Sequence, residues 1–357
     1  MKIISIRYLR AVAALLVVLT HASSSLLRDR SVIPLEFGQY GVDLFFVISG
    51  FIMYFTTARS SVTALDFWIK RGLRIWPLYF MLTTIALAMG IFLKGKVNSF
   101  SGSPTEYIMS LLFIPYLNSM TGDIKPLIGQ GWTLDYEVFF YAIFGLTLFA
   151  GRAFRLAICC CVLLGFATAG LFLRNPGPIL ETYTNPIILE FIWGMIVAYA
   201  VSIERRCIPI LLWTVLPVAF ALTAVSAVYG IGNTMEIFAP GRSIVIGIPC
   251  MALVLVAVLV EERGRVPRWS FPLLVGEASY SLYLAHGFVL GLIRQVWTRL
   301  LDPQNAMAHI TFIVFGTTCC VVALAIIYLC LERKSANFLL SLSRRLPLFA
   351  AMQSTQK

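Results

Sequence analysis

The chain has 357 residues, of which 59% are hydrophobic and only 13% are charged, and its mean hydropathy is +0.86. Soluble domains usually have about a quarter of their residues charged, so a chain this apolar needs lipid as its solvent. The net charge of +11 comes from basic residues that alternate with apolar runs, which indicates topology signals and contact with anionic membrane lipids and excludes a nucleic-acid partner.

Stretches of about twenty apolar residues, long enough to span a bilayer, recur along the chain. They predict ten spans, at 8–27, 38–57, 75–93, 133–150, 155–173, 186–203, 209–228, 242–260, 273–297 and 309–331. Residues 106–117 are apolar but shorter, which favours an interfacial or re-entrant helix. Because lipid satisfies no backbone hydrogen bonds, the predicted fold is all-α, a polytopic membrane bundle of about ten helices.

The basic residues predict the orientation of the bundle. With the N-terminus in the cytoplasm, 19 of the 28 Lys and Arg residues fall in cytoplasmic segments, as the positive-inside rule requires. An even number of spans returns the C-terminus to the same side. We therefore expect one transmembrane domain over residues 1–332 and a basic cytoplasmic tail over residues 333–357. The eight cysteines show no CxxC or Cys/His spacing, so no metal site is predicted.

Two ionisable residues, Arg10 and His21, lie in the first predicted span. Eleven residues make about three helical turns, so both side chains share a face and His21 lies roughly 16 Å further along the axis. An ionisable group in lipid is costly unless it faces the bundle interior, and imidazole is the usual general base near neutral pH. His21 is thus a candidate base. The alternative is that Arg10 is a snorkelling arginine and His21 a residue that bridges helices.

Asp43, in the second predicted span, is expected at a depth close to that of His21. Its carboxylate could hold the imidazole of His21 or stabilise its charged form. The alternative is a structural hydrogen bond between the first two helices.

Arg71 and Arg74 stand three residues apart before the third predicted span. On a helix they share a face, and guanidinium groups bind phosphate bidentately. The alternative is that both act only as positive-inside signals.

The stretch GWTLDYE begins the fourth predicted span with two carboxylates, Asp135 and Glu137. Because they are two residues apart, they point in different directions on a helix and only one can face a common site. Trp132 is expected at the membrane interface.

The stretch SYSLYLAH places Ser279, Tyr283 and His286 on one helical face, at spacings of four and three residues. This polar stripe in an apolar span indicates either a binding surface or hydrogen bonds between helices.

Taken together and in order, these pieces resemble the membrane-bound acyltransferase-3 family, whose members O-acylate bacterial surface sugars. The resemblance rests on Arg10-Ala11 with His21, on GVDLFFVISGF, and on KRGLRIWPLY, GWTLDYE and SYSLYLAH. It implies a protein of the bacterial inner membrane that transfers an acyl group from cytoplasmic acyl-CoA to a hydroxyl of a polysaccharide or lipid-linked oligosaccharide. Acetyl-CoA is the expected co-substrate, with succinyl or another acyl group left open, and no permanently bound cofactor is expected.

The resemblance also implies roles for individual residues. The expected catalytic residues are His21, Asp43 and Glu137, the expected CoA-binding residues are Arg10, Arg71 and Arg74, and the expected acceptor-binding residues are Trp132, Tyr283 and His286. His21 would deprotonate the sugar hydroxyl, or would itself carry the acyl group.

Two readings from other functional classes remain open at this point. Ten spans with charges inside them would also suit a transporter or flippase for a glycolipid or oligosaccharide. A non-catalytic scaffold of a polysaccharide-assembly complex is the third possibility, and it predicts that changing the polar residues alters stability alone.

Overall fold

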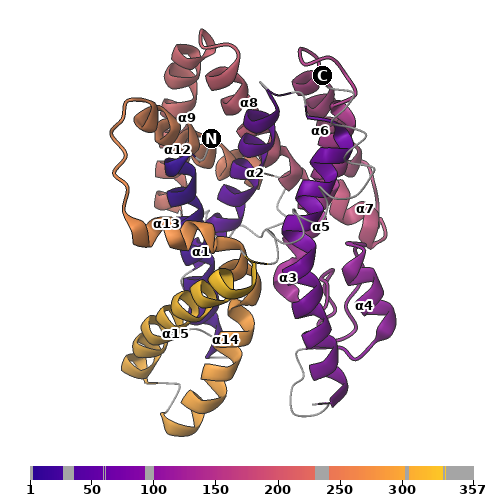
Figure 1. Cartoon of the computed structure of the whole chain (residues 1–357), viewed down its shortest axis with the longest axis vertical. Coiled ribbons are helices and arrows are strands. Elements are labelled where there is room, and N and C mark those ends of the chain that lie inside the picture. The colour runs from indigo at the N-terminus through magenta and orange to yellow at the C-terminus, as the bar shows by residue number, and fades with distance from the viewer. Residues whose placement is uncertain are drawn as a thin grey trace.

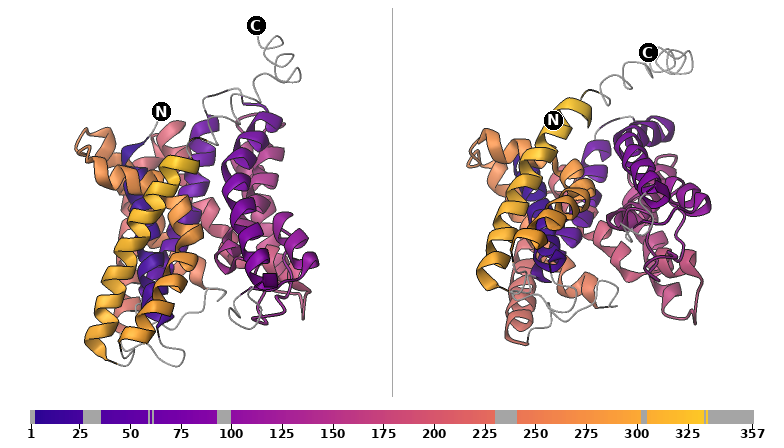
Figure 2. Two further views of the ribbon diagram at one scale, coloured as in Figure 1. Left: turned by 60° about the horizontal axis from the view of Figure 1, so that its bottom comes forward. Right: turned by 90° about the horizontal axis from the view of Figure 1, so that it is seen from below.

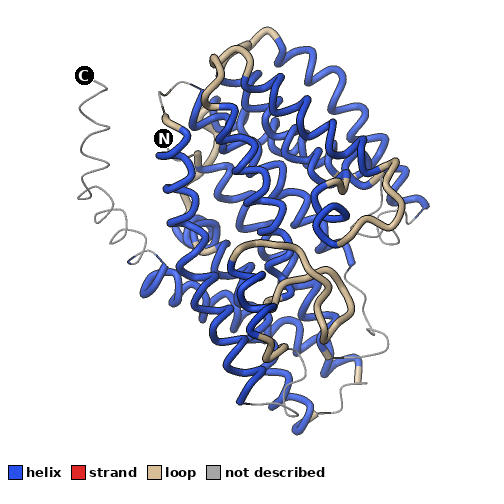
Figure 3. Tube along the Cα trace, turned by 90° about the vertical axis from the view of Figure 1, so that its right-hand side faces the viewer, coloured by secondary structure: helices blue, strands red, loops and turns tan. Residues whose placement is uncertain are grey.

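The computed structural model describes residues 3–26, 36–58, 60, 62–92, 100–229, 241–301, 305–332 and 334. Helices account for most of this part of the chain, which contains no β-strand (Figure 3). The helices are α1 (Ile4–Ser25), α2 (Tyr40–Ala58), α3 (Ala64–Phe92), α4 (Pro104–Leu111), α5 (Trp132–Thr147), α6 (Arg155–Gly170), α7 (Pro178–Tyr183), α8 (Leu189–Ser202), α9 (Cys207–Tyr229), α11 (Arg242–Val245), α12 (Gly247–Glu262), α13 (Ser270–Glu277), α14 (Ser279–Leu300) and α15 (Ala306–Ile327). Single 3-10 turns, at Glu36–Gln39, Gly129–Gly131 and Pro186–Ile188, lead into α2, α5 and α8, and a π-helical turn, Tyr328–Glu332, follows α15. The all-α prediction is confirmed.

Helices α2 and α8 form the centre of the bundle (Figure 1). On one side lie α1, α9 and α12–α15, and on the other side lie α3–α7. The backbones of α2 and α8 touch where each helix has a glycine: a Cβ added to Gly50 would overlap the backbone of Phe191, and one added to Gly194 would overlap the backbone of Val47. Small residues of this kind let membrane helices approach closely.

The start of α1 and the end of α15 lie at the same end of the bundle (Figure 2). Here the carboxylate of Glu261 accepts from the backbone N–H of Ile4 at 2.8 Å, and Glu277 pairs with Arg7 at 3.1 Å and accepts from Tyr328 at 3.2 Å. Several arginines that are predicted to be cytoplasmic lie at this end. They include Arg7, Arg155 beside the end of α2, and Arg205, paired with Glu262. We call it the basic end.

In the described part of the chain, seven helical segments are long and apolar enough to cross a membrane. They are Ile4–Ser25, Tyr40–Ala58, Ala64–Phe92, Pro178–Ser202, Cys207–Ser226, Arg242–Glu262 and Ala306–Cys330. Helices α13 and α14 add an eighth span if they count as one, although the chain bends by 74° between them. The protein is therefore a multi-pass membrane protein.

The predicted count of ten spans is not confirmed. The predicted spans at 133–150 and 155–173 form α5 and α6, of 16 residues each, which is shorter than the roughly 20 residues that a span needs. The third span differs in another way: α3 begins at Ala64, ahead of its basic cluster, so Arg71 and Arg74 belong to the spanning helix itself. Except for Lys334, the predicted basic tail lies outside the described residues.

Candidate active site

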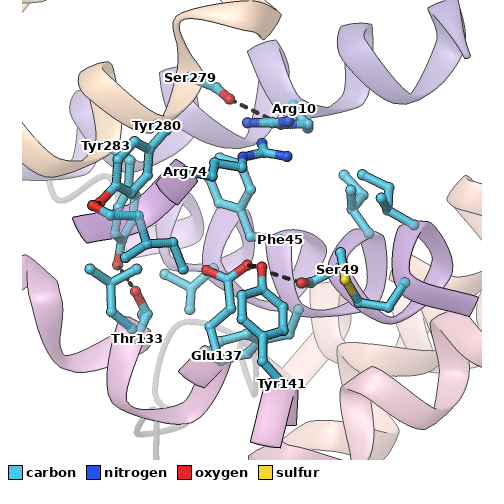
Figure 4. Close-up of a pocket in the computed structure, with 17 residues that line it drawn as sticks. Arg10, Phe45, Ser49, Arg74, Thr133, Glu137, Tyr141, Ser279, Tyr280 and Tyr283 are labelled. Carbon is cyan, nitrogen blue, oxygen red and sulfur yellow. Dashed lines mark hydrogen bonds between the residues drawn. The ribbon is translucent and has the colours of Figure 1, made fainter. Parts of the chain in front are cut away.

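A pocket of about 80 Å³ lies between α1, α2, α3, α5 and α14 (Figure 4). We call it the arginine pocket. Its polar lining consists of Arg10, Ser49, Arg74, Thr133, Glu137, Tyr141, Ser279, Tyr280 and Tyr283. Its apolar wall comes mainly from α2, through Val42, Phe45, Phe46, Ile48, Ile52 and Met53. The polar stretches of five distant helices therefore meet in one place.

The guanidinium groups of Arg10 and Arg74 lie next to each other in this pocket (Figure 4). Arg10 donates from Nε to the hydroxyl of Ser279 at 3.1 Å, and Arg74 forms no salt bridge with any described residue. Two cations held side by side repel each other, and a bound anion offsets that repulsion. The arrangement suits a phosphate or a similar anion, because guanidinium groups bind such groups bidentately.

Glu137 lines the same pocket, where its Oε1 accepts from Ser49 Oγ at 3.0 Å and also from the hydroxyl of Tyr141. The carboxylate is therefore held by α2 and by its own helix. These contacts do not include His21, the residue that Glu137 was expected to orient.

Arg71 does not line the pocket, although a face shared with Arg74 was predicted. Its guanidinium carbon lies 5.6 Å from the ring centre of Phe67 and 5.9 Å from that of Tyr141. Its Nε is buried without a hydrogen-bond partner among the described residues. Arg71 thus packs on two aromatic rings and stays outside the pocket that Arg74 enters.

His21 faces a second histidine. The rings of His21 and His286 lie 4.9 Å apart, centre to centre, at an angle of 37°. His21 is exposed, whereas His286 is fully buried. Nδ1 of His286 lies 3.1 Å from the backbone carbonyl of Leu282. Because a carbonyl only accepts, Nδ1 carries the proton and Nε2 keeps a lone pair, and Nε2 has no partner within the described chain.

This pairing follows from the way α1 and α14 run side by side in the same direction. Arg10 contacts Ser279 near the basic end, His21 contacts His286 further on, and Arg294 donates to the backbone carbonyl of Ser25 at 3.2 Å beyond that. Two residues of the predicted polar face of SYSLYLAH, Ser279 and His286, contact α1, whereas Tyr283 accepts a hydrogen bond from Thr133 of α5. The His21–His286 pair could not be predicted from the sequence, since helical periodicity contains no information about neighbouring helices.

Tyr283 links the histidine pair to the arginine pocket. Its hydroxyl accepts from Thr133 Oγ1 at 3.0 Å inside the pocket, and its ring lies 6.4 Å from the ring of His286. Tyr283 therefore lies between the arginine pocket and the histidine pair.

Asp43 is bound by Arg242 and not by His21. Oδ1 of Asp43 accepts from Nε of Arg242 at 2.8 Å and Oδ2 from a terminal nitrogen at 2.6 Å, and both residues are almost completely buried. The packing of α1 on α2 explains the difference from the prediction: Gly41 sits against Ala13, so Asp43 lies about two turns from the level of His21. Asp43 therefore forms a structural contact, but one that joins α2 to α11 and not, as the alternative had it, the first two predicted helices.

Arg242 is the residue that the sequence analysis missed. It stands at the edge of a predicted span, and a basic residue there looks like any other residue that flanks a span. Glu190 lies fully buried beside this pair and interacts electrostatically with both Asp43 and Arg242. We call Asp43, Glu190 and Arg242 the buried ion cluster.

Trp132 and Asp135 do not line the arginine pocket but a second cavity on another face of α5. The prediction that Asp135 and Glu137 diverge is therefore confirmed, and Glu137 is the one that faces the arginines. No group of three or more His, Cys, Asp or Glu side chains in the described chain could hold a metal ion.

Comparison with known proteins identifies the family of this chain. A family described as an acyltransferase domain matches residues 3–330. The exopolysaccharide production protein ExoZ of Rhizobium meliloti (strain 1021) is 35% identical over 257 residues, which cover 72% of this chain and 78% of that protein. Nodulation protein 10 of Rhizobium leguminosarum bv. viciae is 26% identical over 335 residues, which cover 84% of this chain and 88% of that protein. No solved structure gives a significant match.

Proposed function

The chain belongs to the acyltransferase family that matches residues 3–330, and from this premise we propose that it transfers an acyl group from acyl-CoA to a hydroxyl of an exported polysaccharide or lipid-linked oligosaccharide. The name of its relative ExoZ, a protein of exopolysaccharide production, supports the acceptor class. Acetyl is the acyl group that we propose. The proposed location is the inner membrane of a bacterium, with the basic end in the cytoplasm.

One observation carries the proposal: the pocket with paired arginines is lined by Tyr283, whose ring lies 6.4 Å from that of His286, the partner of the exposed His21. We place the phosphates of CoA at Arg10 and Arg74, with the acyl end along the apolar wall of α2. A pocket of about 80 Å³ cannot enclose the whole donor, so the nucleotide stays outside, towards the basic end.

The chemistry then falls to His21. Its imidazole takes the proton from the sugar hydroxyl while the sugar oxygen attacks the thioester carbonyl. A carbon–oxygen bond forms, the carbon–sulfur bond breaks, and the departing thiolate takes the proton back from the imidazolium, so that the products are the sugar ester and free CoA. His286 packs against His21 and restricts its ring, which is the positioning role that the sequence analysis gave to Asp43.

The test uses protein purified into nanodiscs, acetyl-CoA labelled on the acetyl group, and oligosaccharides from bacterial surface glycans. We expect His21→Ala to lower label transfer by about 10²- to 10⁴-fold. Arg74→Ala should raise the KM for acetyl-CoA by about tenfold through the loss of a charge-assisted hydrogen bond. Arg206→Ala, which removes an almost fully exposed arginine of the basic end, is the matched control and should behave as wild type.

Two outcomes contradict the proposal. If folded His21→Ala protein, judged by its unfolding temperature, keeps full transfer, then His21 is not the base. If the wild type binds no acyl-CoA, then the arginines serve only as topology signals. The break between α13 and α14 is a feature that transporters share, but a transporter would consume no acyl-CoA.

A further inference from the structure

The second cavity has a volume of about 320 Å³ and lies beside the first two turns of α5. The loop before α5 and the segment from α7 to α8 complete its walls. The lining residues are Leu117, Gly122, Asp123, Ile124, Lys125, Trp132, Asp135, Tyr136, Glu181, Thr182 and Asn185. We call it the acidic cavity, because three of its side chains are carboxylates and one is an amine.

Asp135 is the feature of this cavity that requires an explanation. Its side chain is only 4% exposed, and it forms no hydrogen bond or salt bridge with any described residue. A buried carboxylate without a partner is costly, and the positive end of the α5 dipole offsets only part of that cost. A carboxylate that lines a cavity and accepts nothing from the protein is suited to accept from a ligand.

Two aromatic rings stand beside this carboxylate. The rings of Trp132 and Tyr136 meet edge to face, 5.7 Å apart at 90°, and both also pack against Phe46 of α2. Their positions are therefore fixed before any ligand arrives. Glu181, on α7, supplies a second carboxylate to the same space.

A sugar ring matches this combination. It carries hydroxyl groups that donate short, charge-assisted hydrogen bonds to carboxylates, and it has faces of C–H groups that pack on aromatic rings. Lys125 pairs with Asp123 at 2.8 Å, so a phosphate would meet the charges of Asp135 and Glu181 and be repelled. A fatty chain would leave Asp135 without a donor. The cavity thus differs in chemistry from the arginine pocket, although α5 lines both.

The acidic cavity is also close to the histidine pair without containing it. Lys125 lines the cavity. A few residues later, the side chain of Gln130 packs against Gly287, the neighbour of His286. The segment that begins at Lys125 therefore runs from the cavity to the neighbour of His286.

We propose that the acidic cavity binds a sugar residue of the acceptor, next along the polymer to the residue that is acylated, with Asp135 accepting from its hydroxyl groups. This inference rests on the proposed function, since it assigns a subsite to the same acceptor. It makes Asp135 a specificity-determining residue that recognises chain length and not the acyl donor.

The test is a length series. Oligosaccharides of one to eight sugars are cut from the unacylated polysaccharide of a producing strain that lacks this protein. For the wild type, kcat/KM should rise once the chain is long enough to fill the cavity. Asp135→Asn and Glu181→Gln should each raise the KM for long acceptors by about tenfold, the effect of losing one hydrogen bond to a charged group. The KM for acetyl-CoA and the rate with the shortest acceptor should not change.

Asp66→Asn, the same substitution on α3 outside both cavities, is the matched control and should keep the wild-type length dependence. If Asp135→Asn keeps it as well, the proposed subsite is wrong. A loss of activity that is equal for all acceptor lengths also contradicts the proposal, because it would assign Asp135 to the chemical step or to folding.

A binding measurement separates this proposal from the proposed function. The longest oligosaccharide is titrated into wild-type and Asp135→Asn protein in nanodiscs without acyl-CoA, and binding is followed by saturation-transfer NMR. About tenfold weaker binding by the variant would support the subsite even if the protein consumed no acyl-CoA. Equal affinities, or occupation of the cavity by Ca²⁺ to the exclusion of the oligosaccharide, would overturn it while leaving the acyltransferase assignment in place.

Discussion

Asp43 and Asp135 lie in corresponding places and have opposite surroundings. Each stands in the first turn of a helix, α2 or α5, and each is at least nine-tenths buried. Asp43 gives both carboxylate oxygens to Arg242, whereas Asp135 bonds to no described residue and borders a cavity. The first carboxylate is closed off by the protein and the second is left open to a ligand.

Asp43 and Asp135 thus represent two different roles of a charged side chain in an apolar bundle. A buried charge that the protein pairs completely holds helices in one arrangement, and removing one partner is costly. A buried charge that the protein leaves unpaired weakens the empty fold and becomes useful only when a ligand supplies the missing donor. Stability measurements therefore distinguish the two kinds.

The largest effect is expected from Arg242→Met. It leaves Asp43 without its cation in the middle of the bundle, so the free energy of unfolding should fall by about 3–5 kcal/mol. Denaturant unfolding in detergent, compared with Arg206→Met, measures the change. Equal stability of the two variants would show that the buried ion cluster does not hold the helices together.

Gly194→Ala should have the next largest effect, because α2 and α8 carry Asp43 and Glu190 and meet at this glycine. The added methyl group would overlap the backbone of Val47, and overpacking of this kind costs about 1–3 kcal/mol. Gly165→Ala in α6, where a Cβ would meet nothing within 4 Å, is the control and should be neutral or slightly stabilising. Thermal unfolding of both variants checks the difference.

The double variant Asp43→Leu/Arg242→Met should recover most of the stability that Arg242→Met loses. Replacing both partners by apolar side chains removes the charge of Asp43 together with that of Arg242. The remaining carboxylate of the cluster, Glu190, can neutralise itself by taking up a proton, so the free energy of unfolding should return to within about 1 kcal/mol of wild type. A double variant as unstable as the single one would mean that packing of the Arg242 side chain, and not its charge, stabilises the cluster.

The smallest effect on the free energy of unfolding is expected from Asp135→Asn, measured by denaturant unfolding of the protein without substrate. The substitution removes an unpaired buried charge and breaks no hydrogen bond to a described residue, so stability should stay constant or rise by about 1 kcal/mol. If the free energy of unfolding falls by about 2 kcal/mol or more relative to the matched control Asp66→Asn, then Asp135 is a structural carboxylate like Asp43.

Properties that depend on one helix at a time were readable from the sequence. Hydropathy alone determined that the chain is an all-helical, multi-pass membrane protein, because long apolar runs have no other way to satisfy their backbone in lipid. The spacing of residues within a helix determined that Ser279, Tyr283 and His286 share a face and that Asp135 and Glu137 do not. These are consequences of a periodicity that every α-helix has.

Properties that depend on how two helices align were decided only by the tertiary structure. The pairs His21–His286 and Asp43–Arg242 join residues that are far apart in the chain, and the predicted partner of His21 was wrong by about two turns of α2. Likewise, Arg71 packs on the rings of Phe67 and Tyr141 and does not line the pocket that Arg74 enters. The physical reason is that the register between helices is set where small residues such as Gly41 and Gly194 let backbones touch, and such a contact involves two segments whose alignment neither one encodes by itself.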